Sequence, residues 1–277
     1  MKKLLSLLLA ALLLLPLLSV AETLDQGGEG EVLFIDELPA DADISSEIPD
    51  TNEPFIPEGL DRTIIGADNR VTVTNPASYP FSAIGYMHVT AECGCRWSGT
   101  GFMVTKNTMM TAAHCLICTK HNQWADKITV YFGYKNSGNY LYCYNSAWTA
   151  YVGTRFPDGY TDVNDWGYVT FKNSNVGDRT GWLGMDFLTD DELNKLEFYY
   201  IAGYRDEKLK YDLGMISPYD ATRMMILGDT QPGNSGGPIF DSNNYAVGII
   251  VSETVDENFG TRLTNSIYYK MHNEGII

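Results

Sequence analysis

The sequence predicts an all-β protein, and three observations carry that prediction. Short apolar segments with alternating polarity recur along residues 63–277, among them "KITVYFGY", "EFYYIAGY" and "YAVGIIVSE". They are rich in Val, Ile, Thr and aromatic residues, which favour strands, and segments such as "KNSGN" and "DSNN" are typical of the hairpin turns between them. Long helical periodicity is absent until "NSIYYKMHNEGII", where we expect a short C-terminal helix. A sandwich or a barrel fits this pattern.

Residues 1–21 have the pattern of a secretory signal peptide. Lys2 and Lys3 precede an apolar core from Leu4 to Leu18, and the small residues Ser19-Val20-Ala21 follow it. The core is short for a membrane span and contains Pro16. We therefore expect a secreted, extracellular protein that has no membrane partner after the signal peptide is removed.

The next segment, residues 22–62, is acidic and differs from the rest of the chain. It holds thirteen Asp and Glu residues against one base, Arg62, whereas residues 63–277 carry 22 acids and 16 bases. So acidic a stretch with few large apolar residues cannot offset its own ordering entropy. It is either a solvating tail or a pro-segment, and its position favours a pro-segment removed near Arg62-Thr63. The remaining 63–277 is only mildly acidic, so we expect no nucleic-acid partner.

A serine surrounded by glycines stands in "DTQPGNSGGPIF", residues 229–240. Glycine is costly to order, so three glycines near one serine call for a specific reason. A serine hydroxyl is a poor nucleophile unless an imidazole takes its proton and a carboxylate orients that imidazole. His114 in "TMMTAAHC" and Asp165 in "TDVNDWGYVTF" are candidates for these two groups. The sequence thus predicts a catalytic set of His114, Asp165 and Ser235.

The glycines predict the remainder of that site. Gly233 can present its amide to a carbonyl oxygen, and the amide of Ser235 would complete a two-donor oxyanion hole. One such donor stabilises a transition state by about 3 kcal/mol, which outweighs the conformational cost of the glycine. Gly236 and Gly237 would allow substrate and neighbouring strands to approach closely.

At these residues the chain resembles a known family. "TAAHC" and "GNSGGP" resemble the two signatures of chymotrypsin-like serine peptidases, which share the chain order His, Asp, Ser. Residues 63–84, with "NDWGYVTF" and "FGTRLT", resemble more specifically the bacterial glutamyl endopeptidases of the staphylococcal protease type. The resemblance covers 63–277 and implies two six-stranded antiparallel β-barrels with the active site between them. It also implies a serine endopeptidase made as a proenzyme, a monomer without cofactor or metal that acts on protein or peptide substrates.

The resemblance assigns roles residue by residue. His114 is the general base, Ser235 attacks the scissile carbonyl, and Asp165 orients the base. Asp162 is a rival to Asp165, but it falls in a polar turn, whereas Asp165 directly precedes the strand "WGYVTF". We therefore favour Asp165.

The specificity pocket departs from the family pattern. Asp229, Thr230, Ile250 and Ser252 are the candidate substrate-binding residues. Thr230 matches the pocket threonine, but Ile250 stands where acid-specific members have a histidine. Asp229 falls where the trypsin group has its specificity aspartate, and a turn-capping role fits it equally well. The preferred residue before the cleaved bond is left open.

Activation also departs from the trypsin group, in which a freed amino terminus pairs with an aspartate just before the serine. That residue is the uncharged Asn234 here. We still expect removal of the pro-segment to matter, either by steric release or by ordering the new terminus at Thr63.

Five cysteines remain, and export permits disulfides. Relatives join the cysteine after the catalytic histidine to one on the preceding strand, but that strand has Gly99 in the corresponding place. Cys93 or Cys95 could replace it as the partner of Cys115, and Cys118 is the fourth disulfide candidate. A zinc site is the rival interpretation, because Cys-x-Cys and Cys-x-x-Cys supply four thiolates. We favour disulfides, since zinc beside His114 could capture the general base.

Two other functions are compatible with the sequence. A catalytically silent relative could act as a secreted binding protein, although the intact set of His114, Asp165, Ser235 and Gly233 argues against it. An esterase could use the same residues. Reaction with an active-site serine probe separates the first alternative from a peptidase, and peptide and ester substrates compared side by side separate the second.

Overall fold

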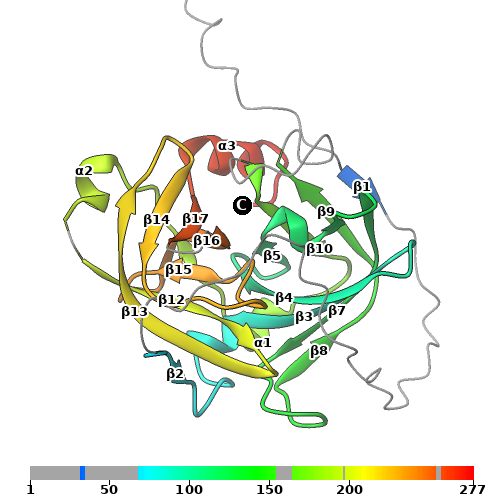
Figure 1. Ribbon diagram of the computed structural model, residues 1–277. Helices are drawn as coiled ribbons and strands as arrows, with labels where there is room; N and C mark the ends of the chain where they lie inside the picture. The colour runs from blue at the N-terminus through cyan, green and yellow to red at the C-terminus, as the bar shows by residue number, and fades with distance from the viewer. Residues whose placement is uncertain (1–31, 35–67, 154–163, 196, 254–256) are drawn as a thin grey trace, which may run out of the picture.

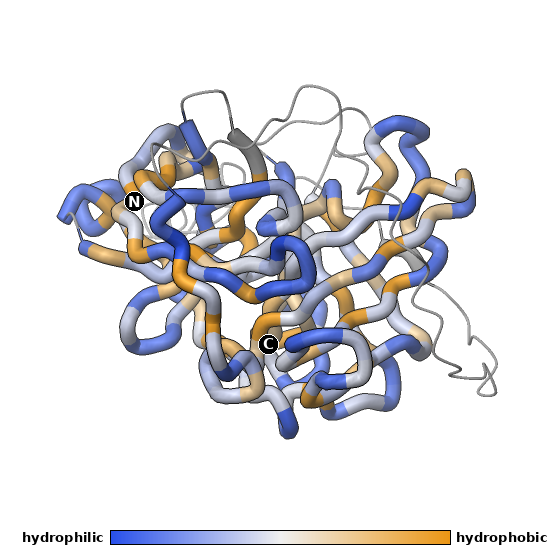
Figure 2. The backbone as a smooth tube through the Cα atoms, turned by 60° about the horizontal axis from the view of Figure 1, so that its bottom comes forward, coloured by the Kyte–Doolittle hydropathy of each residue, from blue (hydrophilic) through white to orange (hydrophobic). Residues whose placement is uncertain are grey.

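The computed structural model describes residues 32–34, 68–153, 164–195, 197–253 and 257–277. The expected signal peptide, the expected cleavage region at Arg62-Thr63 and Asp162 lie outside these residues. The strands of the described chain form two β-sheets (Figure 1). In Figure 2 the hydrophobic residues lie mainly along the strands, and several loops at the periphery are hydrophilic.

The first sheet contains the N-terminal half of the described chain. Its strands run in the order β1-β9-β10-β5-β4-β3-β7-β6, and β8 pairs with β7. Their bounds are β1 Val32–Phe34, β3 Ile84–Ala91, β4 Arg96–Met103, β5 Thr108–Thr111, β6 Ile117–Cys118, β7 Gln123–Phe132, β8 Tyr142–Tyr144, β9 Trp148–Val152 and β10 Gly167–Phe171. In β7 every second residue from Ile128 to Phe132 is buried, as expected for a strand with one face on the core.

The second sheet contains the C-terminal half. Its strands run in the order β11-β16-β15-β12-β13-β14-β17, and β2 pairs with β13. Their bounds are β2 Val71–Thr72, β11 Gly184–Met185, β12 Phe198–Arg205, β13 Lys208–Pro218, β14 Arg223–Leu227, β15 Pro238–Phe240, β16 Tyr245–Glu253 and β17 Asn258–Arg262.

The two sheets differ in closure. In the second, β16 pairs with both β15 and β17, so β12 to β17 close into a six-stranded barrel. In the first, β9-β10-β5-β4-β3-β7 form a half-barrel, because within the described ranges no pairing joins β7 to β9. The prediction of an all-β chain with two barrels is confirmed, with hydrogen-bonded closure in the second.

The helices are short. They are the 3-10 helices η1 Phe81–Ala83 and η2 Ala113–Cys115, and the α-helices α1 Gly177–Thr180, α2 Asp190–Leu193 and α3 Asn265–Asn273. The Thr264 side chain caps α3 by accepting a hydrogen bond from the Ile267 amide, and Ile267 and Met271 bury one face of that helix against the core. The expected C-terminal helix is therefore present. No helix in the described ranges is long and apolar enough to cross a membrane.

Contacts between β4 and β12 join the two sheets. The Thr100 hydroxyl on β4 accepts a hydrogen bond from the Tyr204 amide on β12 at 2.9 Å and donates one to the Gly233 carbonyl at 2.7 Å. Tyr204 also stacks on Tyr86 of β3, with ring centroids 5.1 Å apart. The segment around Ser235 is thus held where the sheets meet.

Strand β1 falls inside the expected pro-segment, residues 22–62. It adds an antiparallel edge to the first sheet, with Leu33 opposite Ala150 of β9.

Candidate active site

His114 and Asp165 are brought together by the pairing of two strands. His114 lies in η2, just after β5, and Asp165 lies two residues before β10. Because Gly167 pairs with Thr111, the start of β10 lies beside the end of β5. The Asp165 Oδ2 lies 2.6 Å from the His114 Nδ1, and the His114 backbone amide donates to the Asp165 Oδ1 at 2.9 Å. Both carboxylate oxygens therefore fix the histidine.

The environment of Asp165 makes this contact strong. Asp165 is fully buried, and its backbone carbonyl accepts a hydrogen bond from the Thr261 hydroxyl of β17 at 3.2 Å. Burial lowers the pKa of His114, but the Asp165 carboxylate and then the neighbouring Cys115 outweigh burial and raise that pKa above its ordinary value. The site therefore stabilises an imidazolium at His114.

Ser235 lies in a loop that is anchored to the strands beside His114. The Thr100 amide donates to the Ser235 carbonyl at 2.8 Å, and the Cys115 Sγ, next to His114 in sequence, donates to the same oxygen at 3.6 Å. The carbonyl of the serine is thus tied to both β4 and η2.

Two glycines after the serine are required by close packing. A Cβ on Gly236, whose φ is +79°, would lie 2.1 Å from both the Thr100 carbonyl oxygen and the Thr111 hydroxyl. A Cβ on Gly237 would lie 2.1 Å from the Ala202 carbonyl oxygen. Only glycine fits at either position, and strands β4, β5 and β12 enclose the loop closely as a result.

Gly233 has the conformation that an amide donor at this position needs. Its φ is +95°, a region that side chains other than that of glycine rarely adopt. Its carbonyl is held by the Thr100 hydroxyl. Within the described part of the chain, neither the Gly233 amide nor the Ser235 amide has a hydrogen-bond partner. Two donors flank Asn234 and are available to a ligand oxygen.

Asn234 is held by a residue that the sequence analysis did not single out. Its Oδ1 accepts hydrogen bonds from the Arg70 Nη1 at 3.1 Å and from the Gln231 amide at 2.8 Å, and its Nδ2 donates to the Tyr204 carbonyl at 3.2 Å. Arg70 is buried and forms a bidentate pair with Asp68, at 2.9 Å for Nε–Oδ1 and 3.0 Å for Nη2–Oδ2. Hydrogen bonding to Arg70 is the main reason that the pKa of Asp68 lies well below its usual range. The one sequence signal for Arg70 is its place in the segment 63–84.

The predicted substrate-binding residues are less exposed than a pocket lining would require. Asp229 is buried, its carboxylate accepts from the Asn69 amide at 2.9 Å, and its own amide donates to Asp212 at 2.8 Å. The hydroxyl of the buried Thr230 donates to the Asn258 Oδ1 at 2.8 Å. The structure places these two residues in a polar network under the serine loop.

Ile250 packs in the hydrophobic core of the second barrel and is 1% exposed. Its backbone holds the serine loop instead, because its amide donates to the Gly237 carbonyl at 2.9 Å and its carbonyl accepts from the Gly236 amide at 2.8 Å. Ser252 lies in β16 opposite Phe259, and its side chain is outside the described part of the structure.

The five cysteines all carry free thiols. The pairing of Cys115 with Cys93 or Cys95 that we favoured from the sequence is absent, because Cys115 is buried beside Ser235. A Cβ on Gly99 would lie 2.7 Å from the Cys115 Sγ, so the glycine occupies the place of a partner cysteine. Cys93, Cys95 and Cys118 lie elsewhere, grouped with His121, a residue that the sequence analysis did not connect with them. The Cys118-x-x-His121 spacing is the signal that could have found it.

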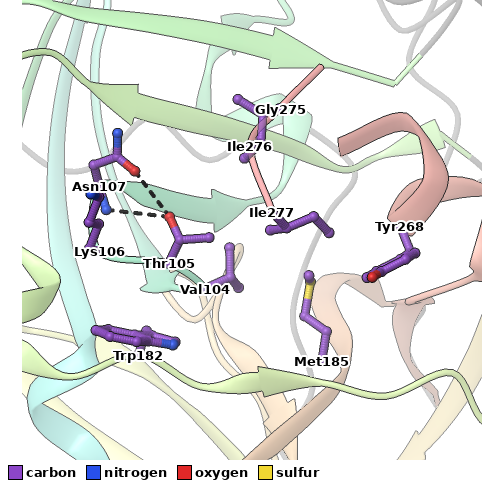
Figure 3. A pocket seen from close by; sticks show the side chains of 10 residues that line it. All are labelled: Val104, Thr105, Lys106, Asn107, Trp182, Met185, Tyr268, Gly275, Ile276 and Ile277. Carbon is purple, nitrogen blue, oxygen red and sulfur yellow. Dashed lines mark hydrogen bonds between the residues drawn. The ribbon is translucent and has the colours of Figure 1, made fainter. Parts of the chain in front are cut away.

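A pocket on another part of the molecule contains none of the predicted site residues. Its lining includes Trp182, Met185, Tyr268 and the C-terminal Ile277 (Figure 3). At its polar edge the Thr105 hydroxyl donates to the Asn107 Oδ1 at 3.2 Å. Its lining residues include none of His114, Asp165 and Ser235.

Comparison with known proteins agrees with this geometry. A model of the trypsin-like peptidase domain matches residues 99–249. The chain is 29% identical over 224 residues to a Bacillus subtilis (strain 168) protein called extracellular metalloprotease, covering 74% of this chain and 67% of that one. It is 25% identical over 229 residues to the glutamyl endopeptidase of Bacillus licheniformis, covering 76% of this chain and 69% of that one.

Solved structures agree in fold. A Glu endopeptidase in complex with MPD superimposes with a TM-score of 0.66 at 23% identity, covering 77% of this chain and 99% of that chain. The thermostable serine protease AL20 superimposes with a TM-score of 0.57 at 16% identity, covering 70% and 96%. The resemblance read from the signatures is thereby confirmed. Because the family model spans more than half of the chain, the protein belongs to the trypsin-like peptidases, as a serine endopeptidase with glutamyl endopeptidases among its relatives.

Proposed function

We propose that the protein is a secreted serine endopeptidase, made as a proenzyme, that hydrolyses peptide bonds through an acyl-enzyme on Ser235. The observation that carries the proposal is the contact between the Asp165 carboxylate and both the Nδ1 and the backbone amide of His114. It favours the tautomer with its proton on Nδ1, in which Nε2 is the nitrogen that can accept the serine proton.

The proposed reaction uses groups of this chain alone. The Ser235 Oγ attacks the scissile carbonyl carbon as its proton moves to the His114 Nε2, and the carbonyl oxygen becomes an oxyanion. The amides of Gly233 and Ser235 would donate to that oxyanion. His114 then gives its proton to the leaving amine, and the C–N bond breaks to leave the acyl-enzyme. Water, deprotonated by His114, attacks the ester and releases the acid and Ser235.

A fluorophosphonate probe tests the proposed nucleophile. The mature protein should gain the mass of one phosphonyl group on the peptide that contains Ser235, and Ser235→Ala should gain none. Thr230→Val is a poor control because Thr230 lies in the polar network under the serine loop. The partly exposed Ser174→Ala serves as the matched variant and should label fully. An unlabelled but folded protein would favour the silent binding protein. Labelling combined with cleavage of esters and not of peptides would favour an esterase.

The position of Ile250 argues against a strict preference for glutamate before the cleaved bond. Because this side chain is packed in the core, it cannot receive a carboxylate from the substrate. We therefore propose that the enzyme lacks a strict glutamate preference. In a peptide library varied at that position, at least one other residue should be cleaved better than glutamate or within about tenfold of it, an energy difference of about 1.4 kcal/mol. A preference for glutamate over every other residue by a hundredfold would contradict it.

A metal-dependent peptidase is the second candidate, because the B. subtilis relative is called a metalloprotease. The described residues contain one group that could hold a metal ion, Cys93, Cys95, Cys118 and His121. Catalytic zinc sites leave a fourth position open for water, whereas four protein ligands close the shell. This group therefore favours a structural ion over a catalytic one, and Ser235 chemistry remains the better supported proposal.

A further inference from the structure

The four potential ligands come from two connections that lie close to His114. Cys93 and Cys95 lie in the turn between β3 and β4, Cys118 ends β6, and His121 lies in the turn before β7. Their ligand atoms all lie within 4.8 Å of one another. The His121 Nδ1 is 3.3 Å from the Cys95 Sγ and 3.5 Å from the Cys118 Sγ. Segments 23 or more residues apart in sequence thus present one nitrogen and three sulfurs to a common centre.

The backbone of both connections is built to hold these side chains. Gly94, between the two cysteines, has a φ of +80°, and a Cβ there would meet no atom within 4 Å, so its backbone conformation alone favours glycine. The turn is closed by hydrogen bonds from the Gly94 amide to the Ala91 carbonyl at 2.8 Å and from the Ala91 amide to the Cys95 carbonyl at 3.0 Å. The His121 amide donates to the Cys118 carbonyl at 3.2 Å. Each pair of ligands is therefore fixed locally.

The spacing suits a tetrahedral ion. Zinc binds thiolate sulfur at about 2.3 Å and imidazole nitrogen at about 2.0 Å, which places ligand atoms in a tetrahedron roughly 3.5–3.8 Å apart. The observed separations lie close to this range, with the longest at most 4.8 Å. Three thiolates and an imidazole are among the ligand sets of structural zinc sites. A disulfide within the group would leave the third cysteine and His121 without a role.

We propose that Cys93, Cys95, Cys118 and His121 bind one zinc ion with a structural role. The ion would join the tip of the β3–β4 hairpin to the segment that follows His114. That hairpin already contacts the segment, because the Trp97 Nε1 donates to the Cys115 carbonyl at 3.1 Å. The ion need not compete for the general base, since the Nδ1 of His114 is held by Asp165 and His114 is not in the group. The proposal stands whether or not Ser235 is the nucleophile.

Metal content of the purified full chain tests the proposal directly. The protein produced with Zn²⁺ in the medium should contain about one zinc per chain, as a four-ligand structural site requires. Cys118→Ser and His121→Ala should lose most of it, and His121→Cys should keep it because a fourth thiolate restores the shell. Cys143→Ser and His272→Ala change the same residue types outside the group and should keep it fully.

Cobalt substitution gives a readout that does not require the variants to fold. Co²⁺ added to the metal-free wild type should produce the intense visible bands of a tetrahedral thiolate site, and Zn²⁺ should abolish them. Removal of the zinc by a chelator should lower the Tm and make three further thiols reactive.

Two outcomes would overturn the proposal. One is a wild-type chain without metal that is lighter by about 2 Da, the two hydrogens lost when a disulfide forms, with the bond mapped to two of these cysteines. The other is a chain without metal whose thiols are free and which gives only octahedral cobalt bands.

Discussion

At the scale of single residues, the site depends on groups that only one residue type can supply. Asp165 is fully buried, and both of its carboxylate oxygens contact His114. Gly236 and Gly237 lie where any Cβ would approach a carbonyl oxygen to 2.1 Å. A cysteine in place of Gly99, in contrast, would contact Cys115.

We expect Asp165→Asn to reduce kcat by about 10⁴-fold, because the amide favours the wrong tautomer of His114. In the wild type, activity should rise with pH as His114 loses its proton, with a midpoint above its ordinary pKa of 6.5 because Asp165 raises that pKa. The residual activity of the variant should rise at lower pH than that of the wild type. Kinetic measurements from about pH 5 to about pH 10 measure both effects, because they extend above the range in which an unperturbed histidine titrates. The exposed Asp126→Asn is the control, and an unchanged kcat in Asp165→Asn would contradict the assignment.

Gly99→Cys should create a disulfide with Cys115. The Cβ at position 99 would lie 3.5 Å from the Cys115 Cβ, at the short end of disulfide geometry. Closing so short a loop stabilises by up to about 3 kcal/mol, so the Tm of the oxidised variant should exceed that of its reduced form by several degrees. Gly101→Cys, whose Cβ would meet Met109 and no cysteine, should show no such response to reductant. Two free thiols in oxidised Gly99→Cys would contradict the prediction.

At the scale of elements, the loop that carries Ser235 is supported from one side by strands and from the other by the segment before β2. Thr100 of β4 holds the carbonyls of Gly233 and Ser235, and Arg70 holds the side chain of Asn234 between them. The uncharged Asn234 thus receives an internal guanidinium where the trypsin group pairs an aspartate with a new terminus. The support comes from a residue 164 positions away.

Arg70→Met should weaken the loop and with it the oxyanion site. A hydrogen bond to a charged group contributes about 1.5–3 kcal/mol, so kcat/KM should fall by about 10- to 100-fold if the loss is felt in the transition state. The rate of fluorophosphonate labelling should fall with it, and KM should change less than kcat. Arg179→Met, at an exposed arginine on α1, should behave as the wild type. A variant with lower Tm but full kcat would show that Arg70 supports the fold alone.

At the scale of the whole molecule, the proposed catalytic residues lie where two sheets meet, and a strand from a separate part of the chain adds to the first sheet. Strand β1 extends the edge at β9 with residues that we propose to be part of the pro-segment. Strand addition at an edge is a common way for one segment to hold another through main-chain hydrogen bonds. The proposed pro-segment would therefore dock on the first sheet through β1.

We expect residues 22–277 to be at least about tenfold less active than residues 63–277, which corresponds to about 1.4 kcal/mol or more of transition-state stabilisation lost before processing. Peptide turnover per mole of folded protein measures the difference. Equal specific activity in the two forms would contradict the proenzyme proposal. A protease-resistant mutant at Arg62, such as Arg62→Gln, controls for self-processing during the assay.

Features that depend on neighbouring residues can be predicted from the sequence alone. Alternating apolar segments indicate strands. The motifs "TAAHC" and "GNSGGP" indicate His114 and Ser235, because each motif is a short run of consecutive residues. Asp165 was preferred to Asp162 from its place before a strand. Such patterns are local, and the physical preferences behind them act over a few residues.

Which distant groups meet is visible only in the folded chain. It removed Cys115 from the cysteine group, added His121 to it, placed Ile250 in the core and brought Arg70 to Asn234. None of these follows from spacing in the chain, because strand pairing and the joining of two sheets set the distances between their side chains.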